Sequence, residues 1–261
     1  MASRIITLTS DFGYRDPFVG TMKGAILRIN PSATIIDLTH GVEAQDILGG
    51  ALSLATSAPY FQSGTVHLAV VDPGVGSSRK PLAIETEDAF YVGPDNGVLS
   101  LAAGTSRVIR TVVLSNTDFH LQPTSSTFHG RDIFSPAAAW ISRGTPVQDL
   151  GETINTFALL DWPAVDRCGD SLIGQVVYID HFGNLITNIR VSEMSTPLDD
   201  LAITIHDTTI QGISASYSVA GQGNSLGIFN SWGLLEIAVC NGNARQDLGA
   251  RIGSKVDIIR P

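Results

Sequence analysis

The sequence predicts an α/β domain with a mostly parallel sheet, followed by a smaller antiparallel β-domain. Strand-like and helix-like segments alternate over roughly the first 150 residues, a rhythm typical of βαβ units. After about residue 172 the segments are strand-like and separated by glycine and asparagine turns, with no helical pattern of any length between them. This change of rhythm indicates two domains of different class.

Each element of the first domain has its own signal. Short apolar runs such as "LAVV" suit strands that are buried on both faces of a sheet. In the helical segments apolar residues recur at every third or fourth position, and Asp46 is placed to cap the second helix. The pattern predicts strands at 4–10, 34–40 and 65–72 and helices at 16–30 and 44–61.

The boundary between the domains is predicted from a local break in the pattern. Turn-forming and charged residues interrupt it in "LLDWPAVDRCGDSL", residues 159–172, as is typical of a linker. We expect a first domain over 1–160, a linker over 161–172 and a second domain over 173–261.

Composition excludes several classes of function. The 25 acidic and 16 basic residues give a net charge of -9, which argues against nucleic acid as a partner. No apolar run approaches the roughly 20 residues that cross a bilayer, and the N-terminus alternates like a strand, so we expect a cytoplasmic protein without a membrane partner. Cys168 and Cys240 have neither disulfide nor zinc-site spacing, and we expect no metal.

Polar residues follow the predicted strands where ligands of parallel sheets bind, beyond the carboxyl ends. Asp11 and Asp16 flank Gly13 after the first strand, and Asp95 and Asn96 follow a later hairpin in "YVGPDNG". Each pair has a structural alternative. Asp11 and Asp16 suit an Asx-turn and a helix N-cap, and "PDNG" is a good turn by itself.

The stretch "VVDPGVGSSRK", residues 70–80, follows the third strand. It matches neither the P-loop nor the dinucleotide fingerprint, because Arg79 stands where each motif, counted from Gly74, requires a glycine. The glycines instead predict a sharp turn that returns Arg79 to the side of Asp72, where the two side chains can pair. The alternative is an ion pair on the surface.

His129 lies in "STFHGRDIFSPAAAW", residues 126–140, in front of a glycine and a helical run. The pattern predicts a loop position near a helix N-terminus. A histidine there is a candidate for chemistry, and a purely structural histidine is the alternative.

The second domain offers candidates in two turns. "YIDHFGNLITN" places Asp180 and Asn184 around a glycine, and a bulged hairpin is the structural alternative. "FNSWGLLEIAVCNGNA" contains Ser231, Trp232 and Asn241. Trp232 suits either the core or stacking on a purine-like ring.

Five motifs together resemble one family. "TSDFGYRDPFVGTMKG", "VVDPGVGSSR", "GPDNG", "FHGRDIF" and "DHFGNLITN" occur in the order and spacing of the S-adenosylmethionine hydroxide adenosyltransferases, which are related to the fluorinase and chlorinase. The match spans nearly the whole chain. The resemblance implies homotrimers of two-domain subunits, with S-adenosylmethionine held between the N-terminal domain of one subunit and the C-terminal β-barrel of its neighbour.

The activity implied by the resemblance is hydrolysis of this small-molecule substrate. Water or hydroxide displaces L-methionine at the 5′ carbon and leaves adenosine, and no cofactor is needed because the sulfonium already activates the carbon. The resemblance also implies roles for individual residues, as follows: Asp72, Arg79 and His129 act on the water; Asp11 and Asp16 match ribose- and methionine-side positions; Asp180 matches a contact to the methionine amino group; Asn184 and Ser231 match further ligand contacts; Phe128 lines the pocket; Asn241 lies where a backbone contact to adenine is expected.

Departures from the halogenases favour water as the nucleophile. The halogenases carry a tyrosine where Asp72 stands, and a carboxylate repels a halide. The fluorinase has Tyr-Ser where His129 and Gly130 stand, and a tryptophan and an arginine at Ile186 and Trp232, so the details of purine and carboxylate binding differ. A sensor that binds S-adenosylmethionine or adenosine without turnover and a halide-using 5′-halogenase are the alternative functions.

Overall fold

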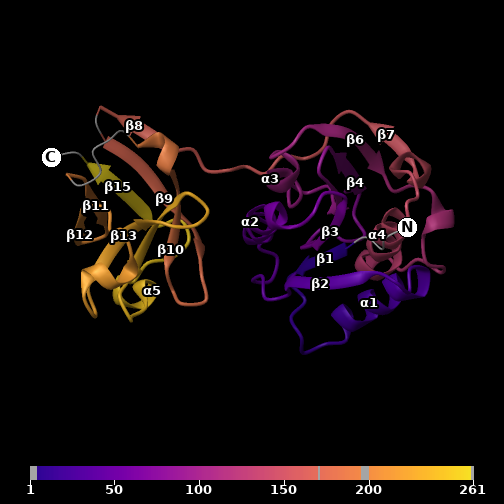
Figure 1. Cartoon of the computed structure of the whole chain (residues 1–261), viewed down its shortest axis with the longest axis horizontal. Coiled ribbons are helices and arrows are strands. Elements are labelled where there is room, and N and C mark those ends of the chain that lie inside the picture. Colours follow the sequence, from indigo (N-terminus) through magenta and orange to yellow (C-terminus); the bar gives the residue numbers. More distant parts are fainter. Residues whose placement is uncertain (1–4, 170, 195–199, 260–261) are drawn as a thin grey trace. The chain divides into compact units, whose positions relative to one another are not determined.

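The computed structural model describes residues 5–169, 171–194 and 200–259 (Figure 1). The chain divides into two compact units, a first unit over Met1–Asp161 and a second unit over Trp162–Pro261. Within the described residues no helix combines the length and the apolar character that crossing a bilayer requires.

One mixed sheet forms the centre of the first unit. Across its described residues the strand order is β2-β1-β3-β5-β4-β6-β7. The pairs β1–β2, β1–β3 and β3–β5 are parallel, and the remaining pairs are antiparallel. The strands are β1 (Ile5–Ser10), β2 (Thr34–Thr39), β3 (Thr65–Val70), β4 (Pro81–Thr86), β5 (Ala89–Pro94), β6 (Val108–Val113) and β7 (Glu152–Ile154).

The predicted α/β class is confirmed, and the sheet is parallel over its first strands only. The chain passes from β4 to β5 through Glu87 and Asp88 alone, a connection short enough only for an antiparallel pair. Parallel strands need a long crossover, which the helices after β1 and β2 supply. The β3–β5 pair is parallel without a helix between its strands, because the chain passes through β4 in between, and the sheet changes direction at the β4–β5 hairpin.

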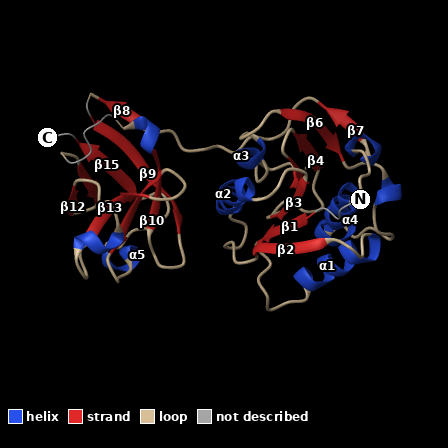
Figure 2. Ribbon diagram, in the orientation of Figure 1, coloured by secondary structure: helices blue, strands red, loops and turns tan. Residues whose placement is uncertain are grey.

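Helices cover both faces of this sheet (Figure 2). Helices α1 (Phe18–Ile29) and α4 (Ser135–Ser142) pack against one face, and α2 (Ile47–Ser57) and α3 (Ser100–Ala103) pack against the other. Strand β3 shows the alternation, because Leu68 and Val70 belong to the first core and Ala69 belongs to the second. The cap predicted at Asp46 is confirmed, since its carboxylate accepts from Gly49 N–H at 2.9 Å.

The second unit is an antiparallel, barrel-like sheet. Its described strands run in the order β12-β11-β15-β9-β10-β14-β13, and β8 pairs with β9. Ser214 N–H, after β12, donates to the carbonyl of Gly227 in β13 at 2.8 Å, which brings the two edges together. The elements are β8 (Asp166–Cys168), β9 (Ser171–Ile179), β10 (Leu185–Arg190), β11 (Ala202–Ile205), β12 (Thr208–Gln211), β13 (Ser225–Phe229), β14 (Leu234–Val239), the short helix α5 (Ala244–Asp247) and β15 (Lys255–Ile259).

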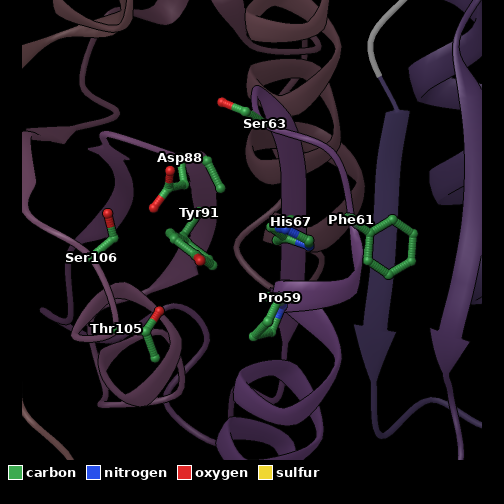
Figure 3. A pocket seen from close by; sticks show the side chains of 10 residues that line it. Pro59, Phe61, Ser63, His67, Asp88, Tyr91, Thr105 and Ser106 are labelled. Atoms are coloured by element: carbon green, nitrogen blue, oxygen red, sulfur yellow. The ribbon is translucent and has the colours of Figure 1, made fainter.

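A buried histidine lies beside a cavity of about 330 Å³ in the first unit (Figure 3). His67 stacks on Tyr91 with ring centroids 5.3 Å apart, meets Phe61 edge to face, and has Nδ1 2.7 Å from Thr7 Oγ1. Because β3 and β5 begin beside this cavity, it lies at the amino ends of the strands. Burial lowers the pKa of His67 to about 4.

The His67 environment makes stability depend on pH. A histidine with a lowered pKa binds fewer protons in the folded protein than in the unfolded chain, so its contribution to stability is lost as the pH falls from 6.5 towards 4. We expect the wild-type protein to lose about 2–3 kcal/mol more unfolding free energy between pH 7.5 and 4.5 than His67→Gln. Urea unfolding at both pH values measures the difference. Equal losses in the two proteins would contradict it.

Candidate active site

Three of the predicted residues meet in the first unit, at the carboxyl end of β3. Arg79 Nε lies 3.0 Å from both carboxylate oxygens of Asp72, and Arg79 Nη2 lies 2.5 Å from Asp72 Oδ2. The same Nη2 is 2.6 Å from Nδ1 of His129. The predicted pairing of Asp72 and Arg79 is confirmed, and His129 joins it from the other side of the guanidinium.

The ion pair is buried within its own unit. The side chains of Arg79 and Asp72 are 8% and 5% exposed, so the alternative of a surface ion pair is wrong. The Arg79 guanidinium also lies over the ring of Phe134, 5.2 Å from its centroid. The charge is thus held by a carboxylate in its plane and an aromatic ring on its face.

The loop between β3 and β4 turns sharply for reasons visible in its sequence. Val75 N–H donates to the Asp72 carbonyl, and Ser77 N–H donates to the Gly74 carbonyl. Gly76 has φ +79°, and a Cβ there would lie 2.6 Å from the carbonyl oxygen of Ser126. Only glycine permits this loop to approach the segment that leads to His129 so closely.

His129 is held at the start of a helix, as its position in the sequence predicts. It precedes a π-helical turn, Gly130–Phe134, that continues into α4. Pro136 has no N–H to donate to the Asp132 carbonyl, and Leu121 N–H donates to that carbonyl instead, at 2.9 Å. The Asp132 carboxylate accepts from Ser125 N–H at 2.8 Å, which fixes the chain ahead of His129.

The partners of His129 define its protonation state. Burial and the positive charge of Arg79 lower the pKa of His129 from its ordinary value, so the ring is neutral near pH 7. A guanidinium can only donate, so Nδ1 of His129 is the acceptor and its proton lies on Nε2. His129 therefore offers an N–H donor to any group that meets Nε2.

Arg79 retains one unused donor. Its Nη1 is shielded from solvent and has no hydrogen-bond partner among the residues that the structure describes. Buried polar groups are nearly always hydrogen-bonded, so an unpartnered guanidinium nitrogen beside a carboxylate and a histidine indicates a place for a bound water or ligand atom.

The predicted residues of the β1–α1 loop differ in how they are held. Asp11 Oδ2 accepts from Gln45 N–H at 2.8 Å, whereas Asp16 is exposed. The N-cap alternative for Asp16 is wrong, because α1 begins at Phe18 with Pro17 at the cap position and no side-chain cap bond. Phe128 packs edge to face on Phe18, 5.3 Å between centroids.

Asp95 and Asn96 make hydrogen bonds within the first unit. Asp95 Oδ1 accepts from Ala158 N–H at 2.6 Å. Asn96 donates to the carbonyl of Val71 at 2.8 Å and accepts from Val98 N–H, so it fixes the backbone next to Asp72. Their predicted contact with substrate stays a prediction.

The remaining candidates lie in turns of the second unit. The Asp180 carboxylate accepts from the backbone of Phe182 and Asn184 and from the Asn184 amide, and the β9–β10 hairpin has the register shift that the structural alternative describes. Trp232 is half-buried against Tyr178. Ser231 and Asn241 are exposed, the latter with φ +55°.

Comparison with known proteins identifies the family of this chain. Residues 6–151 match the profile described as the SAM hydroxide adenosyltransferase N-terminal domain, and residues 174–257 match the C-terminal domain of that family. The chain belongs to the SAM hydroxide adenosyltransferase family. The resemblance of the five motifs is thereby confirmed.

Individual relatives of the family extend the match to the whole chain. The chain is 35% identical over 257 residues to the (R)-S-adenosyl-L-methionine hydrolase of Salinispora tropica, covering 97% of each protein. A fluorinase of Actinoplanes sp. is 26% identical and covers 73% of each chain. The solved structure of an uncharacterized conserved protein from Thermotoga maritima superposes with a TM-score of 0.90 at 35% identity, covering 98% of this chain and 100% of that one.

A second polar cluster in the first unit, which Ser10, Asp37 and His40 form, was not predicted from the sequence. Ser10 is the last residue of β1, His40 directly follows β2, and Asp37 lies within β2. The signal was a histidine three residues after an aspartate at the end of a predicted strand. Nothing in the local sequence shows that Ser10, thirty residues earlier, is its partner.

An alanine substitution tests the close approach of the Ser126 carbonyl to Gly76. We expect Gly76→Ala to lower the unfolding free energy by about 1–3 kcal/mol, because it strains a left-handed residue and displaces the segment before His129. Gly20→Ala, in α1 with nothing within 4 Å of the new Cβ, is the control and should stabilise by up to about 1 kcal/mol. Urea unfolding compares them, and equal stability of both variants would contradict the assignment.

Proposed function

We propose that this chain hydrolyses S-adenosyl-L-methionine to adenosine and L-methionine, by attack of water or hydroxide on the 5′ carbon. The observation that carries the proposal is the buried Arg79 guanidinium, which is paired with Asp72 and His129 and whose Nη1 has no partner among the residues that the structure describes. The family and the name of the Salinispora relative supply the substrate class.

Two donors hold the attacking oxygen. Arg79 Nη1 and the Nε2–H of His129 donate to its lone pairs, and the guanidinium stabilises its hydroxide form. A new bond forms between this oxygen and the 5′ carbon while the bond from that carbon to sulfur breaks. The bonding pair stays on sulfur, and methionine leaves as a neutral thioether, so no cofactor, metal or general acid is part of the proposal.

The proton of an attacking water needs an acceptor. His129 is a poor one, because its only free lone pair, on Nδ1, already accepts from Arg79. Asp72 is the one carboxylate of the set, and it lies on the other side of the same guanidinium. We therefore propose that the bound water loses its proton to solvent under the influence of the Arg79 charge, that Arg79 and His129 position the resulting hydroxide, and that Asp72 orients the guanidinium and balances its charge.

The other residues predicted to contact the substrate belong to the same proposal. Asp11, Asp16, Asp95, Asn96 and Phe128 of the first unit, and Asp180, Asn184, Ser231, Trp232 and Asn241 of the second unit, are its candidate contacts. We propose a homotrimer in the cytoplasm, checked by sedimentation and by fractionation. Cys168 and Cys240 are both free thiols, which supports a reducing compartment.

Product analysis tests the function. The L descriptor in the relative's name fixes the α-carbon, so its R descriptor refers to the sulfonium, and we expect the R epimer to be consumed with adenosine and methionine formed in equal amounts. Arg79→Lys should lower kcat by about 100-fold or more, because an ammonium cannot hold Asp72 and the oxygen together. Arg107→Lys, at a side chain 81% exposed, is the control.

Each alternative function has its own outcome in this assay. Tight binding of an unchanged ligand by the folded protein would replace hydrolysis with a sensor. A 5′-halogenated adenosine formed on addition of chloride or fluoride would replace it with a halogenase, a result that the buried carboxylate of Asp72 disfavours.

The protonation state of His129 predicts the pH profile. A proton on Nδ1 would face the Arg79 donor, so the neutral ring is the active form. Because the pKa of His129 is lowered, we expect kcat/KM to be constant around pH 7 and to fall with acid through an inflection below 6.5. His129→Gln should lower the plateau and remove that inflection. Loss of activity on raising the pH through 7 would contradict the assignment.

A further inference from the structure

A second polar chain lies at the ends of β1 and β2, outside the Asp72 cluster. Ser10 Oγ is 2.7 Å from His40 Nδ1, and His40 Nε2 is 3.2 Å from Asp37 Oδ1, although these last two atoms are not aligned as a hydrogen bond. Asp37 Oδ2 is 2.6 Å from Lys23 Nζ in α1. Ser10 and His40 are 0% and 1% exposed, so this chain is built into the core.

The direction of these contacts follows from the groups themselves. An ionised Asp37 only accepts, so it favours the His40 tautomer with its proton on Nε2. Nδ1 then accepts from the Ser10 hydroxyl, and the Ser10 oxygen is free to accept from Phe12 N–H, at 3.3 Å. Burial lowers the pKa of His40, which keeps this arrangement in place near neutral pH.

Three successive residues of the β1–α1 loop attach to this chain. Phe12 N–H donates to Ser10 Oγ, and Gly13 N–H donates to the carbonyl of His40 at 2.8 Å. The Tyr14 hydroxyl donates to Asp37, and its ring meets the His40 ring edge to face at 5.3 Å. The loop backbone directly after Asp11 is therefore fixed by His40 and its two partners.

A Ser-His-Asp set suggests nucleophilic catalysis, and the geometry argues against it. Ser10 Oγ is inaccessible, already donates to His40 and accepts from Phe12 N–H. A nucleophile must reach a substrate carbon, and no face of Ser10 is open to one. The contacts of the chain point to its neighbouring loop and not to a ligand.

We propose that His40 is a positioning residue, which through Ser10 and its own backbone carbonyl sets the conformation of residues 11–14 and so the placement of Asp11 against the substrate. The inference rests on the proposed function for the identity of that substrate. The loop contacts themselves stand independently of it.

The first unit contains a matched control for this network. Thr7 and His67 form a second buried hydroxyl–histidine pair, also at 2.7 Å, between the neighbouring strands β1 and β3. His67 lies beside the cavity at the amino ends of the strands, away from the β1–α1 loop. Ser10→Ala and Thr7→Ala each remove one hydroxyl from a buried histidine, and only the first touches the loop.

Kinetics with S-adenosylmethionine separate positioning from general stability. We expect Ser10→Ala and His40→Phe to raise KM about tenfold while kcat changes by less than about threefold, because binding is weakened and the Asp72 cluster is untouched. His40→Asn, whose amide oxygen can replace Nδ1 as acceptor, should restore KM in part. Thr7→Ala should leave KM unchanged.

Amide hydrogen-exchange rates report on the conformation of the β1–α1 loop independently of activity. We expect the amides of Phe12 and Gly13 to exchange at least about tenfold faster in Ser10→Ala than in Thr7→Ala, with the rest of the first unit alike in the two variants. Similar exchange in both, or an unchanged KM in Ser10→Ala, overturns the proposal. A wild-type protein that hydrolyses nothing overturns the proposed function, and the exchange result still decides the positioning role.

Discussion

The guanidinium of Arg79 is the group on which the site depends. It only donates, so each neighbour must present a lone pair to it: Asp72 as a carboxylate and His129 as a neutral ring that accepts at Nδ1. One cation thus fixes the charge of one neighbour and the tautomer of the other. It is itself held by burial over Phe134, and its Nη1 has no hydrogen-bond partner in the described parts of the chain.

The contact between Asp72 and Arg79 is local in sequence, whereas the contact between Arg79 and His129 is long-range. Asp72 and Arg79 are seven residues apart, and the turn at Gly74 and Gly76 closes the interval. His129 comes from fifty residues further on, and its approach depends on the absence of a side chain at Gly76. The placement of the acid–guanidinium pair is therefore local, and that of the imidazole is tertiary.

This difference explains what the sequence predicted. The α/β class, the helices after β1 and β2 and the Asp72–Arg79 pair all follow from periodicity or from a short turn. The β4–β5 hairpin was also predicted, but the antiparallel pairing of β6 and β7 beyond β4 was not, since β6 resembles the parallel strands in composition. Ser10 and His40 escaped notice because β1 and β2 pair with a register shift after Leu8, which no local pattern reveals. The N-cap alternative for Asp16 is wrong because Pro17 occupies the cap position of α1.

Charge balance links this arrangement to the choice of nucleophile. With Asp72 ionised and His129 neutral, the cluster carries no net charge, so a sulfonium can approach without repulsion. At 4 Å and an effective dielectric constant of about 20, two unit charges interact by about 4 kcal/mol, which is enough to decide which ions a buried site accepts. Replacing the carboxylate with a neutral phenol, as the resemblance places in the halogenases, leaves the guanidinium uncompensated and suits a halide. The carboxylate at position 72 instead neutralises the guanidinium, which disfavours a halide and suits water.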